Sequence, residues 1–190
     1  MLSGGLSIDI DADGIAAIAR ELGATESMVG KAASRALKRT AATIRKRSMK
    51  ELRTELGLRN NRRLRDRLKL GRVRKSRQGA GSEIKVWFGA NDITVSGFKG
   101  KPRSIPGGAA FRDRSWPGAF VGKKARGPDT GRPTVFKRKG ADAHPLKEQG
   151  LDVADVIETF VEDTIFPSVG EIFMHHFRAD LRARAIHGIG

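Results

Sequence analysis

The sequence contains no cysteine and no tyrosine, and only two tryptophans among its 190 residues. Without cysteine the chain holds no disulfide, iron–sulfur cluster, cysteine-ligated zinc or thiol nucleophile, which fits synthesis in a reducing compartment. Apolar stretches are interrupted by charges well short of the roughly 20 residues that a bilayer span requires. The first residues also lack a cationic segment followed by an apolar one, so no secretory signal is expected. We therefore expect a soluble protein that is not bound to a membrane.

Positive charge is abundant but unevenly distributed. The chain has 37 Lys and Arg against 21 Asp and Glu, a formal net charge of +16. Residues 31–77 hold nineteen basic and three acidic residues, whereas residues 1–30 and 141–190 carry more acidic than basic side chains. This distribution predicts a cationic face or projection and not a uniformly basic protein.

Apolar periodicity predicts helices in the first third of the chain. A short amphipathic helix covers 13–22 and ends at Gly23, and a longer one with many alanines covers 25–47. A separate helical stretch is expected over 49–56, and Asn60 and Asn61 open a further turn or two up to Leu68.

The middle of the chain changes to a strand-like pattern. Apolar and polar residues alternate over 84–88, a further strand is expected at 93–95, and another at 134–138. Residues 97–115 combine glycine, proline and cations, which predicts a long projecting loop with a strand near 109–112.

Two aromatic residues, Trp116 and Phe120, follow that loop directly. We expect them at its base, in a contact between subunits. The alternative is that both rings fill the core of their own subunit, where each would contribute roughly 1.5–3 kcal/mol.

The C-terminal part carries the clearest helical pattern. Its apolar positions share one helical face: Val153, Val156, Ile157, Phe160, Val161, Thr164 and Ile165. Pro167 is predicted to interrupt this helix, and Ser168 with Glu171 forms a capping box that restarts it.

The order of these elements predicts an α+β fold: N-terminal helices, a small antiparallel sheet with long loops, and a C-terminal helix interrupted by a proline. Residues 1–24 are expected to form an acidic arm with a short helix, and 25–190 a single domain.

No pattern in the sequence indicates catalysis, so neither an enzyme nor a cofactor is expected. His175 and His176 are adjacent on a helix and point about 100° apart, which prevents them from chelating one metal. Asp9, Asp11 and Asp13 alternate without the glycine and distal glutamate of a calcium loop. Phosphate-binding glycine loops and nucleophile elbows are missing too.

A dense basic run is the main candidate site. Repulsion among its side chains is costly unless anions lie nearby. Nucleic acid, an acidic protein surface and plain solvation are all open explanations, and phosphates suit the run better than base edges do. Its members are Arg59, Arg62, Arg63, Arg65, Arg67, Lys69, Arg72, Arg74, Lys75 and Arg77.

The chain resembles the minor tail protein Z family, the tail-completion proteins of long-tailed bacteriophages. The order of several weak motifs carries this resemblance: a basic Ala-rich helix (31–47), an Arg-rich segment (59–77), Pro117-Gly118-Ala119-Phe120, a strand at 135–137, Pro145-Leu146, and a C-terminal helix broken at Pro167 and resumed toward Arg182. Residues 1–24 extend beyond the match, and 140–151 departs from it.

The resemblance implies a structural protein of the virion, without enzymatic activity, in the phage neck or upper tail. Such proteins form rings, usually of six subunits, and their partners are the tail tube, the tail terminator and the head–tail connector; non-specific contact with genomic DNA is also implied. The alternative is a cellular nucleic-acid-binding protein of ribosomal or architectural type, for which this net charge is ordinary.

A closed ring needs a contact in which one surface meets a different one. We expect acidic residues of the C-terminal region, including Glu158 and Glu162, to meet basic ones of the long helix, including Arg35, Lys38 and Arg39, across that contact. The alternative is that these charges pair within one subunit, where each exposed pair contributes only about 0–1 kcal/mol.

Overall fold

The computed structural model describes residues 12–75 and 82–188. The acidic stretch with Asp9 and Asp11, and Arg77 of the basic run, lie outside these ranges. Helices and small antiparallel sheets make up the described chain, so the α+β prediction is confirmed. The backbone divides into two compact units, one of residues 1–48, 68–89 and 159–190, the other of residues 49–67 and 90–158.

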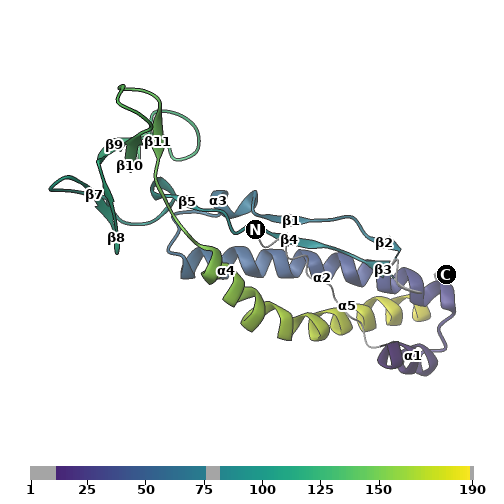
Figure 1. Ribbon diagram of the computed structural model, residues 1–190. Coiled ribbons are helices and arrows are strands. Elements are labelled where there is room, and N and C mark those ends of the chain that lie inside the picture. The colour runs from purple at the N-terminus through teal and green to yellow at the C-terminus, as the bar shows by residue number, and fades with distance from the viewer. Residues whose placement is uncertain (1–11, 76–81, 189–190) are drawn as a thin grey trace. The chain divides into compact units, whose positions relative to one another are not determined.

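The first unit combines helices with a narrow β-ribbon (Figure 1). Its elements are α1 (Ala12–Glu21), most of α2 (Glu26–Glu55), β1 (Leu68–Leu70), β2 (Arg74–Lys75), β3 (Ser82–Glu83), β4 (Val86–Phe88), η2 (Val161–Ile165) and α5 (Phe166–His187). Strand β1 pairs with β4, and β2 with β3, all antiparallel.

The core of this unit lies between the helices and one face of the ribbon. Buried alanines of α2 allow close packing, and α5 supplies large rings, with Phe173 and Phe177 stacked 5.9 Å apart. In the ribbon, Leu68 and Phe88 face each other in register and are both buried. The next pair, Lys69 and Trp87, therefore lies on the opposite face, because side chains alternate along a strand.

The second unit is mostly antiparallel sheet. Its elements are the end of α2, α3 (Arg62–Arg65), β5 (Ile93–Thr94), η1 (Val95–Gly97), β6 (Arg103–Ile105), β7 (Gly108–Phe111), β8 (Arg114–Pro117), β9 (Ala119–Lys123), β10 (Pro133–Arg138), β11 (Leu146–Glu148), β12 (Gly150–Leu151) and most of α4 (Ala154–Phe160). Two three-stranded sheets have the orders β6-β7-β8 and β11-β10-β9, and β12 pairs with β5.

The N-terminal helices follow the prediction with one difference. Helix α1 ends two residues before Gly23, whose φ of +58° is the left-handed conformation that glycine adopts readily. The expected break near residue 48 is wrong, because α2 runs for 30 residues without interruption. Ser48 is fully buried at that point and the helical hydrogen bonding continues past it.

The prediction of a long loop over 97–115 is also wrong, although the strand expected near 109–112 is present as β7. This segment contains β6, β7 and the start of β8, which form a meander with tight turns. Gly107 and Arg112 take positive φ values of +72° and +51° at the two turns. Small residues weaken the alternating apolar pattern by which strands are recognised in a sequence. The middle strand reads Gly-Ala-Ala-Phe and buries Ala109, Ala110 and Phe111.

The C-terminal helix is interrupted, but by a π-helical turn and not at Pro167 as expected. The π-helical turn η2 comes before Pro167, which occupies the first turn of α5, where a missing N–H is tolerated. Ser168 is no N-cap, because its hydroxyl donates to the carbonyls of Thr164 and Ile165 within the helix. The wider turn separates the buried residues Phe160 and Ile165 by five positions instead of four.

Candidate interaction surfaces

The structure divides the basic run between the two units. Residues 59–67 belong to the second unit and 69–75 to the first. Several of these side chains are engaged within their own unit: Arg59 donates to the carbonyl of Gly100 at 2.6 Å, and Arg63 and Arg67 each make several contacts. The expectation that all ten cations face a partner therefore needs correction for Arg59, Arg63 and Arg67.

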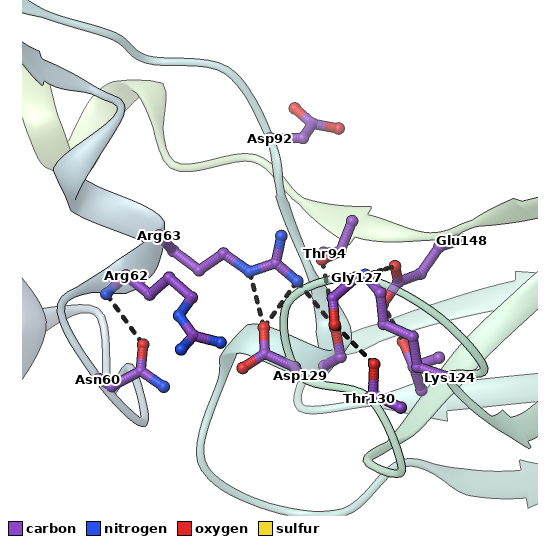
Figure 2. A network of polar contacts seen from close by, with 12 residues as sticks. Asn60, Arg62, Arg63, Asp92, Thr94, Lys124, Gly127, Asp129, Thr130 and Glu148 are labelled. Atoms are coloured by element: carbon purple, nitrogen blue, oxygen red, sulfur yellow. Dashed lines mark hydrogen bonds and ion pairs between the residues drawn. The ribbon is translucent and has the colours of Figure 1, made fainter.

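Arg63 binds Asp129 in the connection between β9 and β10. Its Nε and Nη2 lie 2.9 Å and 2.7 Å from one carboxylate oxygen of Asp129, and Nη2 also donates to the hydroxyl of Ser96 at 3.1 Å. Figure 2 shows the guanidinium directed from α3 toward this carboxylate. Both side chains are largely buried, so this is an internal ion pair of the second unit.

Arg67 holds the chain just after α3. Its guanidinium donates to the carbonyls of Arg63 and Asp92 at 2.8 Å each, and to that of Asn91 at 3.3 Å. Burial, with help from the neighbouring charge of Arg63, lowers the pKa of Arg67. Three of its five N–H donors are thus committed to backbone carbonyls, which makes this side chain part of the fold.

A second internal pair lies nearby in the same unit. Lys124 contacts Glu148 at 2.5 Å, and the other carboxylate oxygen of Glu148 accepts from the hydroxyl of Thr134 at 2.8 Å (Figure 2). Burial opposes ionisation of Glu148, but hydrogen bonds from Lys124, Ser96 and Thr134 outweigh it and lower the pKa of this carboxyl. The acidic groups on this part of the sheet are thus neutralised internally.

Five other cations of the run are exposed, and the side chain of Lys75 lies outside the described part of the structure. Arg62 and Arg65 lie on the surface of α3, and Lys69, Arg72 and Arg74 on the ribbon of the first unit. The ammonium of Lys69 sits 5.7 Å from the ring centre of Trp87. A shallow hollow of about 150 Å³ is lined by Gly71, Arg72, Arg74, Glu83 and Lys85. The ribbon therefore presents a compact cationic surface with one half-buried aromatic ring.

The expected interface charges have different environments. Arg35 donates to Asp180 at 3.2 Å within the first unit, although its own side chain stays 58% exposed. Lys38 and Arg39 are exposed on α2, and Glu158 and Glu162 on the C-terminal helix; within the described ranges none of these four forms an ion pair. Arg35 is thus partly engaged by Asp180, and the other four charges could contact another subunit.

The two aromatic residues after the meander separate. Trp116 is 8% exposed and faces Ala109 in register, whereas Phe120 is 39% exposed. Their expected common place at an intersubunit contact is therefore wrong for Trp116, which fills the core of the second unit. Phe120 remains a surface residue and pairs with Phe136, with ring centres 6.1 Å apart.

Buried polar groups stabilise the helical pair of the first unit. Asp180 has a side chain only 4% exposed and accepts from Arg35 and, at 2.8 Å, from Arg184. Burial raises its pKa, but hydrogen bonds from these two arginines outweigh that effect, so the pKa lies below the ordinary value. On the same helix, the Nε2 of His176 lies 3.2 Å from the Thr43 hydroxyl, and burial together with the charges of His175 and Arg39 lowers its pKa.

Sequence reasoning missed Asp129, Arg112, Phe136 and Phe166 as residues of interest. Asp129 and Arg112 hold positive φ values; aspartate tolerates this conformation and glycines lie two residues either side of Asp129, but no glycine lies within three residues of Arg112. Phe166 is 49% exposed because the π turn before it shifts the helical register. An irregular turn of this kind has no signal in a regular periodicity.

Residues 12–75 and 82–188 contain no cluster of three His, Cys, Asp or Glu side chains that suits a metal ion. Within the same ranges every helix is too short or too polar to cross a bilayer. Comparisons of the chain with protein-family models, with curated proteins and with solved structures found no match.

Proposed function

We propose that this chain is a structural protein of the neck or upper tail of a long-tailed bacteriophage. In this role it is a tail-completion subunit that forms a ring, with six copies around the tail axis, between the tail tube and terminator on one side and the head–tail connector on the other. It assembles in the host cytoplasm and remains in the virion. Its task is mechanical joining, without a catalytic step.

The proposal is carried by the order of features in which the sequence resembles the minor tail protein Z family. The basic Ala-rich stretch lies within α2, the tetrapeptide 117–120 forms the corner between β8 and β9, and 135–137 lies within β10. These three features thus occupy regular elements or a tight corner, whereas the Arg-rich segment is divided between the two units.

Exposed charges without internal partners give further support. Lys38 and Arg39 on α2, and Glu158 and Glu162 on the C-terminal helix, form no ion pair within the described ranges. A ring of identical subunits requires two different surfaces that fit each other, and opposite charges set their register and speed their encounter. The cationic ribbon suits non-specific contact with the phosphates of passing DNA.

The test is a phage in which the gene for this chain is deleted. We expect filled heads and tails to accumulate without being joined, with loss of infectious titre, and a plasmid copy of the gene to restore both. Electron microscopy of lysates counts joined and free particles, and an epitope tag locates the chain in virions. Normally joined, fully infectious particles from the deletion phage would contradict the proposal.

A further inference from the structure

Two exposed phenylalanines stand in surroundings of opposite charge. Among the described residues, Phe120 is 39% exposed and Phe166 is 49% exposed. Phe120 lies on β9 of the second unit and Phe166 at the start of α5 in the first. A single exposed ring is common on a protein surface, so it indicates a contact only where the charges around it match those of a second surface.

Phe120 belongs to an aromatic pair built into the sheet β11-β10-β9. It lies opposite Phe136 in register, and the ring centres are 6.1 Å apart. Gly122 is what leaves room for these rings, because a Cβ there would come within 3.1 Å of the Phe136 ring and 3.8 Å of the Phe120 ring. The sheet therefore has a defined apolar surface at this point, which we call the Phe pair.

One exposed cation, Arg138, lies beside the Phe pair on the same face. Arg138 lies two residues beyond Phe136 and shares its face of the sheet, and it is exposed. Lys123 and Lys137 are exposed too, but by the same alternation they project from the opposite face. Glu148 lies opposite Phe136 in register, but its carboxylate is bound by Lys124 and Thr134, and no ion pair between it and Arg138 is found among the described residues.

The surroundings of Phe166 are acidic. Glu162 and Asp163 lie one helical turn before it and are exposed, and Gly170 lies one turn after it. Residues 152–174 contain no Lys, Arg or His; their acidic residues are Asp152, Asp155, Glu158, Glu162, Asp163 and Glu171. Phe166 is thus an apolar residue with carboxylates beside it and no cation in its own segment.

We propose that Phe166, with Glu162 and Asp163, binds the Phe pair and Arg138 of a second copy of this chain. The two surfaces are apolar at the centre and opposite in charge at the rim, as at other protein interfaces. They are different surfaces of one chain, so the contact is heterologous and propagates from copy to copy until a ring closes. For Glu162 it replaces the contact with Arg35, Lys38 and Arg39 that the sequence predicts, and it leaves these α2 cations without an assigned partner in the ring.

This inference deepens the proposed ring, but it rests on self-association alone and not on the phage assignment. If the chain pairs through these surfaces but virions form normally without it, the inference stands and the proposed function is wrong. If the chain joins heads to tails through other surfaces, the reverse holds.

Three glycines allow a matched crosslinking test in a chain that has no cysteine of its own. Gly170 lies beside Phe166, Gly140 lies two residues after Arg138, and Gly30 lies on α2 next to Lys31. All three lack a positive φ, and an added Cβ meets no atom within 4 Å at any of them. A single cysteine at each site is therefore tolerated.

The purified full-length Gly170→Cys and Gly140→Cys variants are mixed and treated with a short bis-maleimide, then separated on a denaturing gel. We expect a crosslinked product of twice the chain mass from the mixture, little from either variant alone, and a ladder of higher multiples from the double variant. Adding Glu162→Arg to the Gly170→Cys chain should abolish the product. Adding Arg138→Glu to the Gly140→Cys chain as well should restore it.

The control mixture is Gly170→Cys with Gly30→Cys, which reports the alternative contact of the acidic helix with α2. A product from this control equal to or stronger than that with Gly140→Cys overturns the proposal. So does the absence of product with Gly140→Cys at the highest soluble concentration, or a double variant that is crosslinked only within single chains.

Discussion

Asp129 accepts two close contacts from the guanidinium of Arg63, at 2.9 Å from Nε and 2.7 Å from Nη2, while its own backbone stands at a φ of +69°. A left-handed backbone at a residue other than glycine costs roughly 1–2 kcal/mol, somewhat less for aspartate. The ion pair offsets this cost, because it is largely buried and charge-assisted. Arg63 thereby fixes the connection between β9 and β10 against α3.

Replacing Asp129 separates the ion pair from the backbone strain. Asp129→Asn keeps a side chain that tolerates positive φ but loses the charge, so we expect the free energy of unfolding to fall by about 1–2 kcal/mol. Asp129→Gly loses the pair but relieves the backbone, and should be less destabilising than Asp129→Ala. Urea unfolding midpoints measure the order, with exposed Asp142→Asn as the control. Equal midpoints for the glycine and alanine variants would show that the strain is negligible.

Regular amphipathic patterns were predicted well from the sequence. The spacing of apolar residues located α1, the body of α2 and the C-terminal helix, and the alternation at 84–88 located β4. These elements bury one regular face, so their period is visible in the residues themselves. The α+β class followed from their order alone.

The meander and the fate of the arginines were not predictable in the same way. Strands β6 to β8 are rich in residues with low strand propensity, such as glycine, alanine and proline, so of the three only β7 was expected, and pairing between neighbours forms the other two. The local sequence does not distinguish Arg63 from Arg65, yet Arg63 is largely buried against Asp129 and Arg65 is exposed. Burial of a charge depends on a distant partner, which the local sequence does not contain.

Arg112 is the second residue that combines a positive φ with several side-chain contacts. Its guanidinium lies 4.7 Å from the ring centre of Phe98 and 5.5 Å from that of Phe111, and it donates to the carbonyl of Leu56 at 3.0 Å. It therefore satisfies a carbonyl near the end of α2 and covers two rings of the second unit.

Arg112→Lys tests whether the planar guanidinium is needed. Lysine keeps the charge but lacks the flat group that stacks on rings while donating sideways. We expect Arg112→Lys to lower the free energy of unfolding by about 1 kcal/mol and Arg112→Ala by more. Thermal unfolding with exposed Arg114→Lys as the control measures both. A lysine variant as stable as the parent would show that charge alone suffices.

Asp180 predicts a pH dependence of stability. Its pKa is lowered in the folded state, so its contribution is complete above the ordinary pKa of aspartate and is lost as the pH falls through the folded value. Asp180→Asn should lower the free energy of unfolding by about 2 kcal/mol at neutral pH. The difference from the parent should shrink as the pH falls below about 4. Urea unfolding over this pH range measures the difference, with exposed Asp155→Asn as the control. A difference between Asp180→Asn and the parent that stays constant with pH would contradict the role of the Asp180 charge.

The ribbon of the first unit is the surface that we expect to contact DNA phosphates. Lys69→Glu with Arg74→Glu reverses two of its exposed cations, and Arg103→Glu with Arg114→Glu makes the same charge change on the exposed meander. Both doubles reduce long-range attraction, but loss of real phosphate contacts also flattens the salt dependence, by roughly one unit of log–log slope per contact. We expect this flattening only in the ribbon double, measured by fluorescence anisotropy of a short labelled duplex over a salt series. Identical slopes for the two double variants would show that only net charge, and no specific ribbon contact, governs DNA binding. Tight saturable binding by the parent chain at about 150 mM salt would favour a cellular nucleic-acid-binding protein over a tail subunit.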